Sequence, residues 1–350
     1  NIIPLISRQT ADSLLYFPQQ NAREYVMRRI GRKLLRIVLW VFAAIVFLLL
    51  ISSMVHATYF RQRFENIEPY GELVEVFDGS MHLYSVGEGE KTIVLLPGMG
   101  VGLPSADFGP LMRALGEKYT VVVVEYFGVG FSSTTERPRS SANYVEEIRT
   151  ALATAGFRGP YVLMGHSISS AYSELYASLH PEEVEAIISL DGTSTALSAP
   201  MPAFAKALLP IARVQQDLGL TSLLGPLVTN ADAIGSLGYT TQEIQDMLVF
   251  AGFSVNRTLL AQMGNVSESI EEVMRVPFPP QVPYLKLIAS DTYEKPNPML
   301  PVTPIEYQLQ HLERIGGHAQ YKVLEGTHFL YQTNVDKIVQ LTDLFLASRL

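Results

Sequence analysis

Ser167 stands in a setting in which a serine can act as a nucleophile. It is the middle residue of Gly165-His166-Ser167-Ile168-Ser169, which follows the apolar run YVLM and precedes a helical pattern. A sharp turn between a strand and a helix exposes such a serine above a sheet, and small residues two positions on either side of it avoid clashes. Gly165 fits this pattern, and Ser169 replaces the usual glycine with another small residue. The sequence therefore predicts that Ser167 is a nucleophile.

A serine hydroxyl needs a neighbouring base, because it is a weak nucleophile at its ordinary pKa. The chain has seven histidines, and His328 stands in Glu325-Gly326-Thr327-His328, directly after the last strand-like run. The carboxyl ends of parallel strands gather at one edge of a sheet, so His328 and Ser167 can meet there. We therefore expect His328 to be the base.

The base needs a carboxylate that orients its ring. Asp291 follows the strand-like run YLKLIA, and with it the chain order is Ser167, Asp291, His328, the order typical of such a sheet. Asp191, after ISL, and Glu125, near the end of VVVVEY, also stand at strand ends and are the alternatives. Asp291 is the predicted third member.

The tetrahedral intermediate of an acyl transfer needs two hydrogen-bond donors for its oxyanion. One predicted donor is the N–H of Ile168, immediately after the nucleophile. The other is expected in the glycine-containing loop Pro97-Gly98-Met99-Gly100, where the N–H of Met99 is our choice and that of Gly100 is the alternative. No cofactor or metal is required by this chemistry.

The elements that must position these residues alternate between strands and helices. Predicted strands are Leu73–Phe77, Met81–Val86, Thr92–Leu96, Thr120–Tyr126, Tyr161–Met164, Val184–Leu190, Tyr284–Ala289 and Gln320–Leu324. Predicted helices cover about residues 107–117, 141–155, 168–179, 304–315 and 335–348. Such alternation predicts an α/β fold with a mostly parallel eight-stranded sheet, helices on both faces and an antiparallel opening hairpin.

One interval breaks the alternation. Residues 195–280 contain no convincing strand and are too long for a plain loop, so we expect a helical cap that interrupts a core of residues 71–194 and 281–350. Its apolar residues, which are candidates for the lining of a pocket, are Met201, Phe204, Leu208, Leu209, Met247, Phe250, Phe253 and Met263. The same residues could instead pack the cap against the core.

Residues 37–55 form a run of nineteen residues without a charge. At ~1.5 Å per residue a helix of this length covers ~28 Å, close to the ~30 Å hydrocarbon core of a bilayer. We therefore expect a single transmembrane helix, preceded by an N-terminal segment 1–36 and followed by a linker 56–70. Lysines and arginines are concentrated before it, which predicts a cytoplasmic N-terminus and an extracytoplasmic domain. A cleaved signal peptide is the alternative, although the apolar run exceeds the usual length.

Charge and composition exclude several functions. Residues 1–63 carry a net charge of +7, whereas residues 64–350 hold 17 Lys/Arg against 32 Asp/Glu, a net charge of −15. The basic part flanks the apolar run, which points to a membrane, and the acidic remainder argues against nucleic-acid binding. There are no cysteines, so disulfides and thiolate metal sites are excluded. Oligomeric state is not indicated.

Taken together, the strand followed by PGMG, the stretch EYFGVGFSS, the GHSIS turn, the IASD strand end and the EGTH terminus resemble the α/β-hydrolase superfamily over about residues 70–350. The resemblance is to its esterase, lipase and proline-iminopeptidase-like branch. Many relatives begin the oxyanion loop with His-Gly where this chain has Pro97-Gly98, and many have Asp where Glu125 stands. A serine nucleophile argues against the epoxide-hydrolase and haloalkane-dehalogenase chemistries, which use aspartate.

The resemblance and the residues imply a membrane-anchored hydrolase of an ester of a small-molecule or lipid-like acyl group. An aminopeptidase is the alternative, and it would need an acidic cap residue to hold the substrate amine. The candidates for that residue are Asp217, Asp232, Glu243 and Asp246. A catalytically silent subunit of a membrane complex is a further alternative, although a scaffold has no need of a complete set of catalytic side chains.

Overall fold

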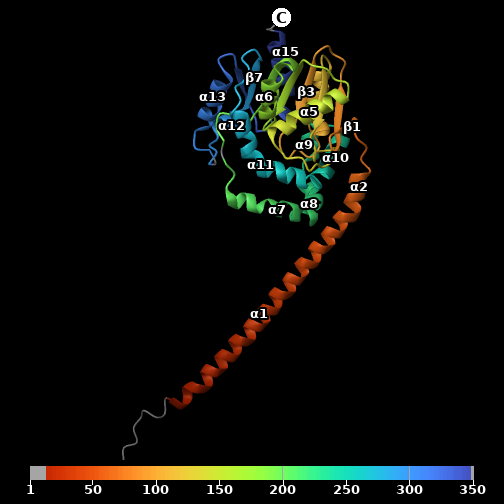
Figure 1. Cartoon of the computed structure of the whole chain (residues 1–350). Coiled ribbons are helices and arrows are strands. Elements are labelled where there is room, and N and C mark those ends of the chain that lie inside the picture. Colours follow the sequence, from red (N-terminus) through yellow and green to blue (C-terminus); the bar gives the residue numbers. More distant parts are fainter. Residues whose placement is uncertain (1–12, 199, 299, 348–350) are drawn as a thin grey trace, which may run out of the picture. The chain divides into compact units, whose positions relative to one another are not determined.

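A computed structural model of the chain describes residues 13–198, 200–298 and 300–347. The chain divides into two compact units between Val55 and His56, and each is described by itself. The first contains helix α1 (Ser13–Val55). The second contains the sheet and the remaining helices (Figure 1).

Helix α1 contains the predicted apolar run. One window of the helix has a mean hydropathy of 2.9 and none of its residues is buried within the protein, so the helix is long and apolar enough to cross a membrane. Residues 37–55 lie entirely inside α1. The first twelve residues of the expected segment 1–36 lie outside the described part of the chain. The expected linker 56–70 begins as helix, with η1 (His56–Phe60) and α2 (Arg61–Glu65).

The second unit is built on an eight-stranded sheet with the order β1-β2-β4-β3-β5-β6-β7-β8. The strands are β1 (Glu72–Val76), β2 (Gly79–Val86), β3 (Thr92–Leu96), β4 (Thr120–Glu125), β5 (Tyr161–His166), β6 (Val184–Leu190), β7 (Tyr284–Ala289) and β8 (Gln320–Leu324). Strands β3 to β8 are parallel, and β2 pairs antiparallel with both β1 and β4. The predicted strand count, hairpin and fold class are confirmed.

Helices cover both faces of the sheet because alternate strand residues point to opposite sides. Val94 and Leu96 of β3 pack in one apolar cluster with α5 (Ser141–Thr154) and α6 (Ser169–Leu179). Ile93 and Leu95 pack in the other cluster with α4 (Gly109–Gly116) and α15 (Val335–Ala347). The nearly continuous apolar runs of the central strands are therefore buried on both faces.

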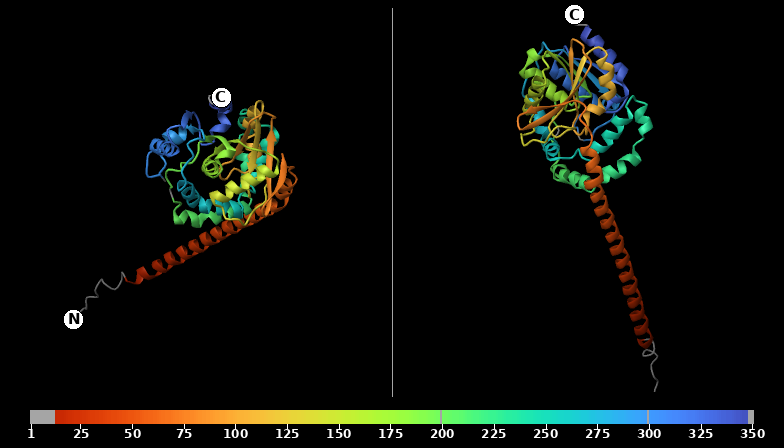
Figure 2. Two further views of the ribbon diagram at one scale, coloured as in Figure 1. Left: turned by 45° about the horizontal axis from the view of Figure 1, so that its top comes forward. Right: turned by 90° about the vertical axis from the view of Figure 1, so that its right-hand side faces the viewer.

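Residues of the expected cap form helices and, among those that the structure describes, no strand. They are α7 (Ala203–Asp217), α8 (Leu220–Val228), α9 (Ala231–Gly235), α10 (Thr241–Ala251) and α11 (Arg257–Met274). These helices, coloured green to cyan, gather beyond one edge of the sheet (Figure 2). Phe64 of α2 packs on Phe250 and Phe253, so the segment that follows α1 is part of this layer.

Candidate active site

The backbone at Ser167 has the sharp turn that the sequence predicts. Ser167 lies between β5 and α6 with a φ of 57°, a left-handed conformation that non-glycine residues rarely adopt. Its N–H donates to the carbonyl oxygen of Leu190 at 3.1 Å, which fixes the turn against β6. A Cβ at Gly165 would lie 2.7 Å from the carbonyl oxygen of Ser169, so only glycine fits there. The strain is held by the surrounding structure, as is common at functional sites.

Ser169, which departs from the usual glycine, has a defined use in the turn. Its hydroxyl donates to the carbonyl oxygen of Pro97 and lies 2.7 Å from the hydroxyl of Tyr126. Ser169 is fully buried, so both contacts satisfy a group that would otherwise lose its hydration. The substitution therefore ties the turn to the loop that follows β3.

His328 lies beside Ser167, as predicted. Its Nε2 is 2.9 Å from Ser167 Oγ, and its Nδ1 is 2.6 Å from a carboxylate oxygen of Asp191. A carboxylate only accepts hydrogen bonds, so Nδ1 carries the proton and Nε2 of the neutral ring accepts from the serine hydroxyl. This is the tautomer that a general base for Ser167 requires.

Asp191 is held as an acceptor by groups besides His328. Its side chain is fully buried, and the carboxylate accepts from the N–H of Ala289 at 2.9 Å and from the hydroxyl of Thr292 at 2.6 Å. The φ of Asp191 is 47°, so this residue also occupies a strained turn directly after its strand. The buried carboxylate is thus surrounded by donors, the arrangement that offsets its desolvation.

The prediction that Asp291 orients His328 is corrected by this geometry. Asp291 lies in the first turn of α12 (Ser290–Glu294), where its side chain is about a third exposed and sits 2.7 Å from Lys295 Nζ. Strand β6, which ends at Leu190, lies directly beside the strand of the nucleophile, whereas β7 is one strand farther away. The carboxylate that His328 contacts is that of Asp191, at the end of β6. In the sequence, Asp191 follows an apolar run and is followed by Gly192. This pattern is the local signal for Asp191, which is one of the two alternatives to Asp291.

Glu125, the other alternative, has a different set of contacts. Its carboxylate lies 3.0 Å from His82 Nδ1 and accepts from the N–H groups of Ser105 and Phe131. Glu125 and His82 are both fully buried. This carboxylate thus fixes the loops after β3 and β4 and takes no part in the contacts of His328.

His166 contributes to the site in a way that the sequence did not indicate. Its Nε2 donates to the carbonyl oxygen of His328 at 3.0 Å, and the two rings lie 4.7 Å apart. Burial, and after it the neighbouring His328, lowers the pKa of His166 to about 3, so the ring is neutral above that pH. His166 is therefore a neutral donor that holds the backbone of His328.

The loop after β3 lies against the nucleophile. A Cβ at Gly98 would come within 2.5 Å of His166 Nδ1 and 3.1 Å of Ser167 Cβ, so glycine allows the loop to approach this closely. Within the described part of the chain, the N–H groups of Met99 and Ile168 have no protein acceptor. The two donors predicted for an oxyanion are thus not engaged by the protein. Their role stays a prediction.

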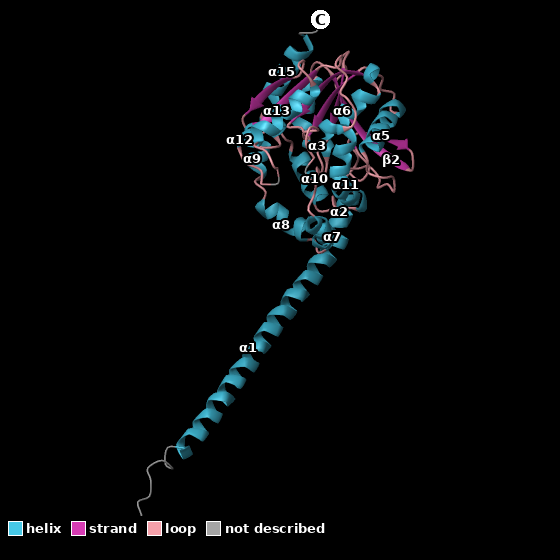
Figure 3. Ribbon diagram, turned by 60° about the vertical axis from the view of Figure 1, so that its left-hand side comes forward, coloured by secondary structure: helices cyan, strands magenta, loops and turns pink. Residues whose placement is uncertain are grey.

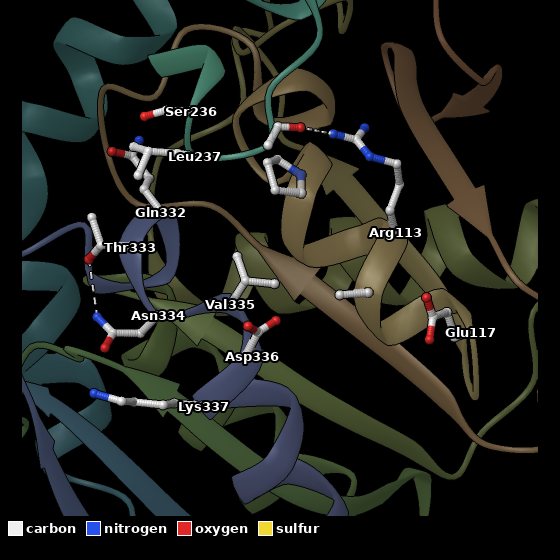
Figure 4. A pocket seen from close by; sticks show the side chains of 13 residues that line it. Arg113, Glu117, Ser236, Leu237, Gln332, Thr333, Asn334, Val335, Asp336 and Lys337 are labelled. Carbon is white, nitrogen blue, oxygen red and sulfur yellow. Dashed lines mark hydrogen bonds between the residues drawn. The ribbon is translucent and has the colours of Figure 1, made fainter. Parts of the chain in front are cut away.

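Two pockets differ in how close they lie to the predicted catalytic residues. A pocket of about 480 Å³ is lined by Asp191, Thr193 and His328 together with residues of α12 and α13 (Pro304–Ile315). A pocket of about 700 Å³ lies between α4 and the start of α15 and contains neither Ser167 nor His328. Figure 4 shows its lining, with Arg113 on one side and Gln332, Thr333 and Asn334 on the other. The first pocket borders the reactive side chains.

Among the described residues, one cluster brings possible metal ligands together, namely His180, Glu182 and Glu183. It follows the C-terminal end of α6, whereas Ser167 precedes the other end of that eleven-residue helix. Glu183 is bound by Arg149 at 2.6 Å. This cluster is remote from the serine and carries no indication of a metal.

Comparison with known proteins agrees with the geometry. Residues 91–225 match the family model described as the α/β hydrolase fold, and this range contains the Pro97 loop, Ser167 and Asp191. The chain therefore has the α/β-hydrolase fold. An uncharacterised protein of Bacillus subtilis (strain 168), YbdG, is 26% identical over 90% of this chain and 97% of its own length.

Solved structures show the same fold at low identity. The enol-lactonase from Burkholderia xenovorans LB400 is 17% identical, with a TM-score of 0.56 over 79% of this chain and all of that chain. The Cif epoxide hydrolase from Acinetobacter nosocomialis is 14% identical, with a TM-score of 0.58 over 84% of this chain and 96% of that chain. These hydrolases are similar in the sheet and its helices, and the similarity concerns the fold alone.

Asp191→Asn and Asp291→Asn form a matched pair that separates the two carboxylates. Asp191→Asn is expected to reduce kcat/KM for a p-nitrophenyl ester by about 10⁴-fold, because an amide favours the wrong tautomer of the base. Asp291→Asn should change the rate by no more than a few-fold, since it removes only the ion pair with Lys295. Equal losses in the two variants, with circular dichroism spectra unchanged, would contradict the assignment of Asp191.

His166→Ala removes the donor to the His328 carbonyl, and we expect a loss of about 10- to 100-fold in kcat with little change in KM. His166→Gln, which can still donate, should recover part of the rate. Because the pKa of His166 is about 3, neither variant should move the acid limb of the pH profile of kcat/KM. The ring is uncharged over the working range, and a displaced limb would mean that it titrates there.

Proposed function

We propose that the chain is a membrane-anchored serine hydrolase that cleaves an ester of a small-molecule or lipid-like acyl group. The observation that carries the proposal is the pair of hydrogen bonds that joins Ser167 Oγ to His328 Nε2 at 2.9 Å and His328 Nδ1 to Asp191 at 2.6 Å. This is the arrangement of a nucleophile, a general base and an orienting carboxylate.

The reaction follows from these contacts. His328 takes the proton of Ser167 as Oγ attacks the acyl carbon, and the carboxylate of Asp191 stabilises the imidazolium that forms. The N–H groups of Ile168 and Met99 would hold the oxyanion of the tetrahedral intermediate. The proton of His328 then passes to the leaving alcohol. Water, activated by the same histidine, releases the acid from Ser167.

The cap favours an ester over an aminoacyl substrate. Of the acidic residues that an aminopeptidase would need, Asp246 accepts from Tyr70 at 2.8 Å and Glu243 pairs with Arg113 at 2.5 Å. Asp217 pairs with Arg213 at 3.0 Å. These carboxylates are engaged within the protein, which leaves Asp232 as the candidate for an amine. The solved enol-lactonase acts on an ester bond by its name, which is compatible with the proposal.

The first test is labelling of the full chain by a fluorophosphonate probe, with Ser167→Ala as the control. Wild type should label and hydrolyse p-nitrophenyl acyl esters, with a preference for the longer acyl chains, and Ser167→Ala should do neither. Faster hydrolysis of aminoacyl p-nitroanilides than of any ester would favour the aminopeptidase. A wild-type chain that neither labels nor hydrolyses either series would favour the silent subunit.

The proposed topology places the hydrolase domain on the extracytoplasmic side, with α1 as the anchor. It is supported by the lysines and arginines that precede the apolar run, six of them between residues 23 and 36. Proteinase K added to intact cells, or to spheroplasts where an outer envelope is present, should therefore remove the domain. Digestion that occurs only after lysis would show that the domain lies on the cytoplasmic side, which contradicts the proposed topology.

A further inference from the structure

The cap carries an apolar face that is turned to solvent. Phe204 and Leu208 were candidates for the lining of a pocket, yet their side chains are 71% and 52% exposed. Leu227 and Val228 at the end of α8 are 79% and 82% exposed. Large apolar side chains exposed singly need no explanation, but a group of them on adjacent helices marks an interaction surface.

The residues of this face follow the helical repeat. On α7, positions 204, 208, 211 and 214 recur at intervals of three and four, so their side chains share one side of the helix. Gln216 lies on the other side, where it is buried and exchanges hydrogen bonds with the backbone of Val255. Lys206 and Arg213 lie off the apolar side and pair with Glu268 and Asp217. Helix α7 thus has a packed side and a separate, uncharged apolar side.

Helix α8 extends the same kind of surface. Residues 218–230 contain no charged side chain. We define the cap face as the exposed apolar side chains of the two helices, namely Phe204, Leu208, Ile211, Val214, Leu223, Leu224, Leu227 and Val228. Helices α7 and α8 lie on the side of the hydrolase domain where α2 lies, away from α15, in two views that differ by 60° (Figures 1 and 3).

His56, the first residue of the hydrolase domain, contacts helix α8. His56, the residue that follows the apolar run 37–55, is buried, and its Nδ1 lies 2.9 Å from the hydroxyl of Ser222 on α8. Its ring stacks on Phe253 with 4.4 Å between centroids. The residue at which the chain leaves the apolar helix is therefore fixed to the element that carries Leu227 and Val228.

We propose that the cap face lies in the interfacial layer of the bilayer that holds α1. This inference rests on the proposed membrane anchor. An anchored chain places His56 at the membrane surface, and the contact of His56 with Ser222 brings α8 to the same level. Amphipathic helices at a membrane lie in the plane of the interface, with the apolar face about 5–10 Å into the boundary between headgroups and acyl chains.

The charge of the domain and the apolar character of the cap face favour lipid acyl chains as the partner of this face. The attractive interaction would be the hydrophobic effect. Residues 64–350 carry a net charge of −15, which would be repelled by anionic headgroups. The cap face contributes no charge of either sign. Its burial therefore needs an apolar environment, which the acyl chains next to an anchored domain supply. The substrates that such a cap would admit are acyl esters that partition into the bilayer.

The absence of cysteine makes a site-specific test direct. Single variants Leu208→Cys and Leu227→Cys of the full chain, each labelled with the environment-sensitive fluorophore NBD, would be reconstituted at one chain per nanodisc of phosphatidylcholine. Leu344→Cys is the matched control, because Leu344 is a leucine of α15 that is 61% exposed. Val41→Cys reports whether α1 is in the bilayer. Lipids brominated at shallow or deep positions would serve as quenchers.

We expect blue-shifted emission and quenching by shallow bromines at positions 208 and 227, with neither effect at position 344. If positions 208 and 227 emit as position 344 does while position 41 is quenched by deep bromines, the cap face is in water and the inference is wrong. Shielding that arises only with several chains per disc would identify a second copy as the occupant and would also overturn it. An unquenched position 41 would instead refute the anchor.

A second measurement connects the cap face to activity. Leu208→Gln/Leu227→Gln should slow hydrolysis of a long-chain ester embedded in the same discs several-fold and leave the rate on soluble p-nitrophenyl acetate unchanged. Fluorophosphonate labelling of Ser167 in these samples reports the active site independently. Unchanged rates on the embedded ester would contradict a role of the face in substrate access, and loss of labelling in wild type would refute the hydrolase itself.

Discussion

The hydrogen bond between Asp191 and His328 is the interaction on which the arrangement of the site depends. A buried carboxylate is costly unless donors surround it, and here the N–H of Ala289, the hydroxyl of Thr292 and the imidazole share that task. Ala289 ends β7 and Thr292 lies in the adjoining α12, while His328 follows β8, so two separate segments converge on one side chain. The carboxylate that contacts His328 thereby also fixes the ends of neighbouring strands.

Small residues and close contacts recur around Ser167 at this same edge of the sheet. Ser167 is strained, and its position depends on what surrounds it: the glycine at 165, the buried hydroxyl of Ser169 on the Pro97 carbonyl and the close approach of Gly98. The link through Ser169 couples the turn that carries Ser167 to the loop expected to supply an oxyanion donor. A glycine at position 169 would leave the turn intact and remove that link.

Much of the fold was predictable because buried parallel strands appear in the sequence as continuous apolar runs. Strands Thr92–Leu96 and Tyr284–Ala289 have the predicted bounds. The turn at Ser167 and the choice of His328 as its proposed base follow from local patterns. The choice among Asp191, Asp291 and Glu125 does not, because each follows a strand and only the side-chain contacts at the strand ends decide which carboxylate reaches the histidine. Nor does a local pattern reveal that His166 holds the backbone of His328, since that contact joins residues 162 positions apart.

The cap shows a different limit of prediction from the sequence, because the sequence does not say where the apolar residues of the cap lie. Apolar residues in a helical insertion are equally compatible with a pocket, a core or an outer surface, and accessibility alone separates Phe250, which is 3% exposed, from Phe204, which is 71% exposed. An outward apolar side is unfavourable in water, so it requires an apolar partner. For an anchored domain the nearest such partner is the bilayer, and the contact of His56 with Ser222 joins α8 to the residue that follows the proposed anchor. We infer that the proposed anchor and the cap face bring the domain to the same membrane surface.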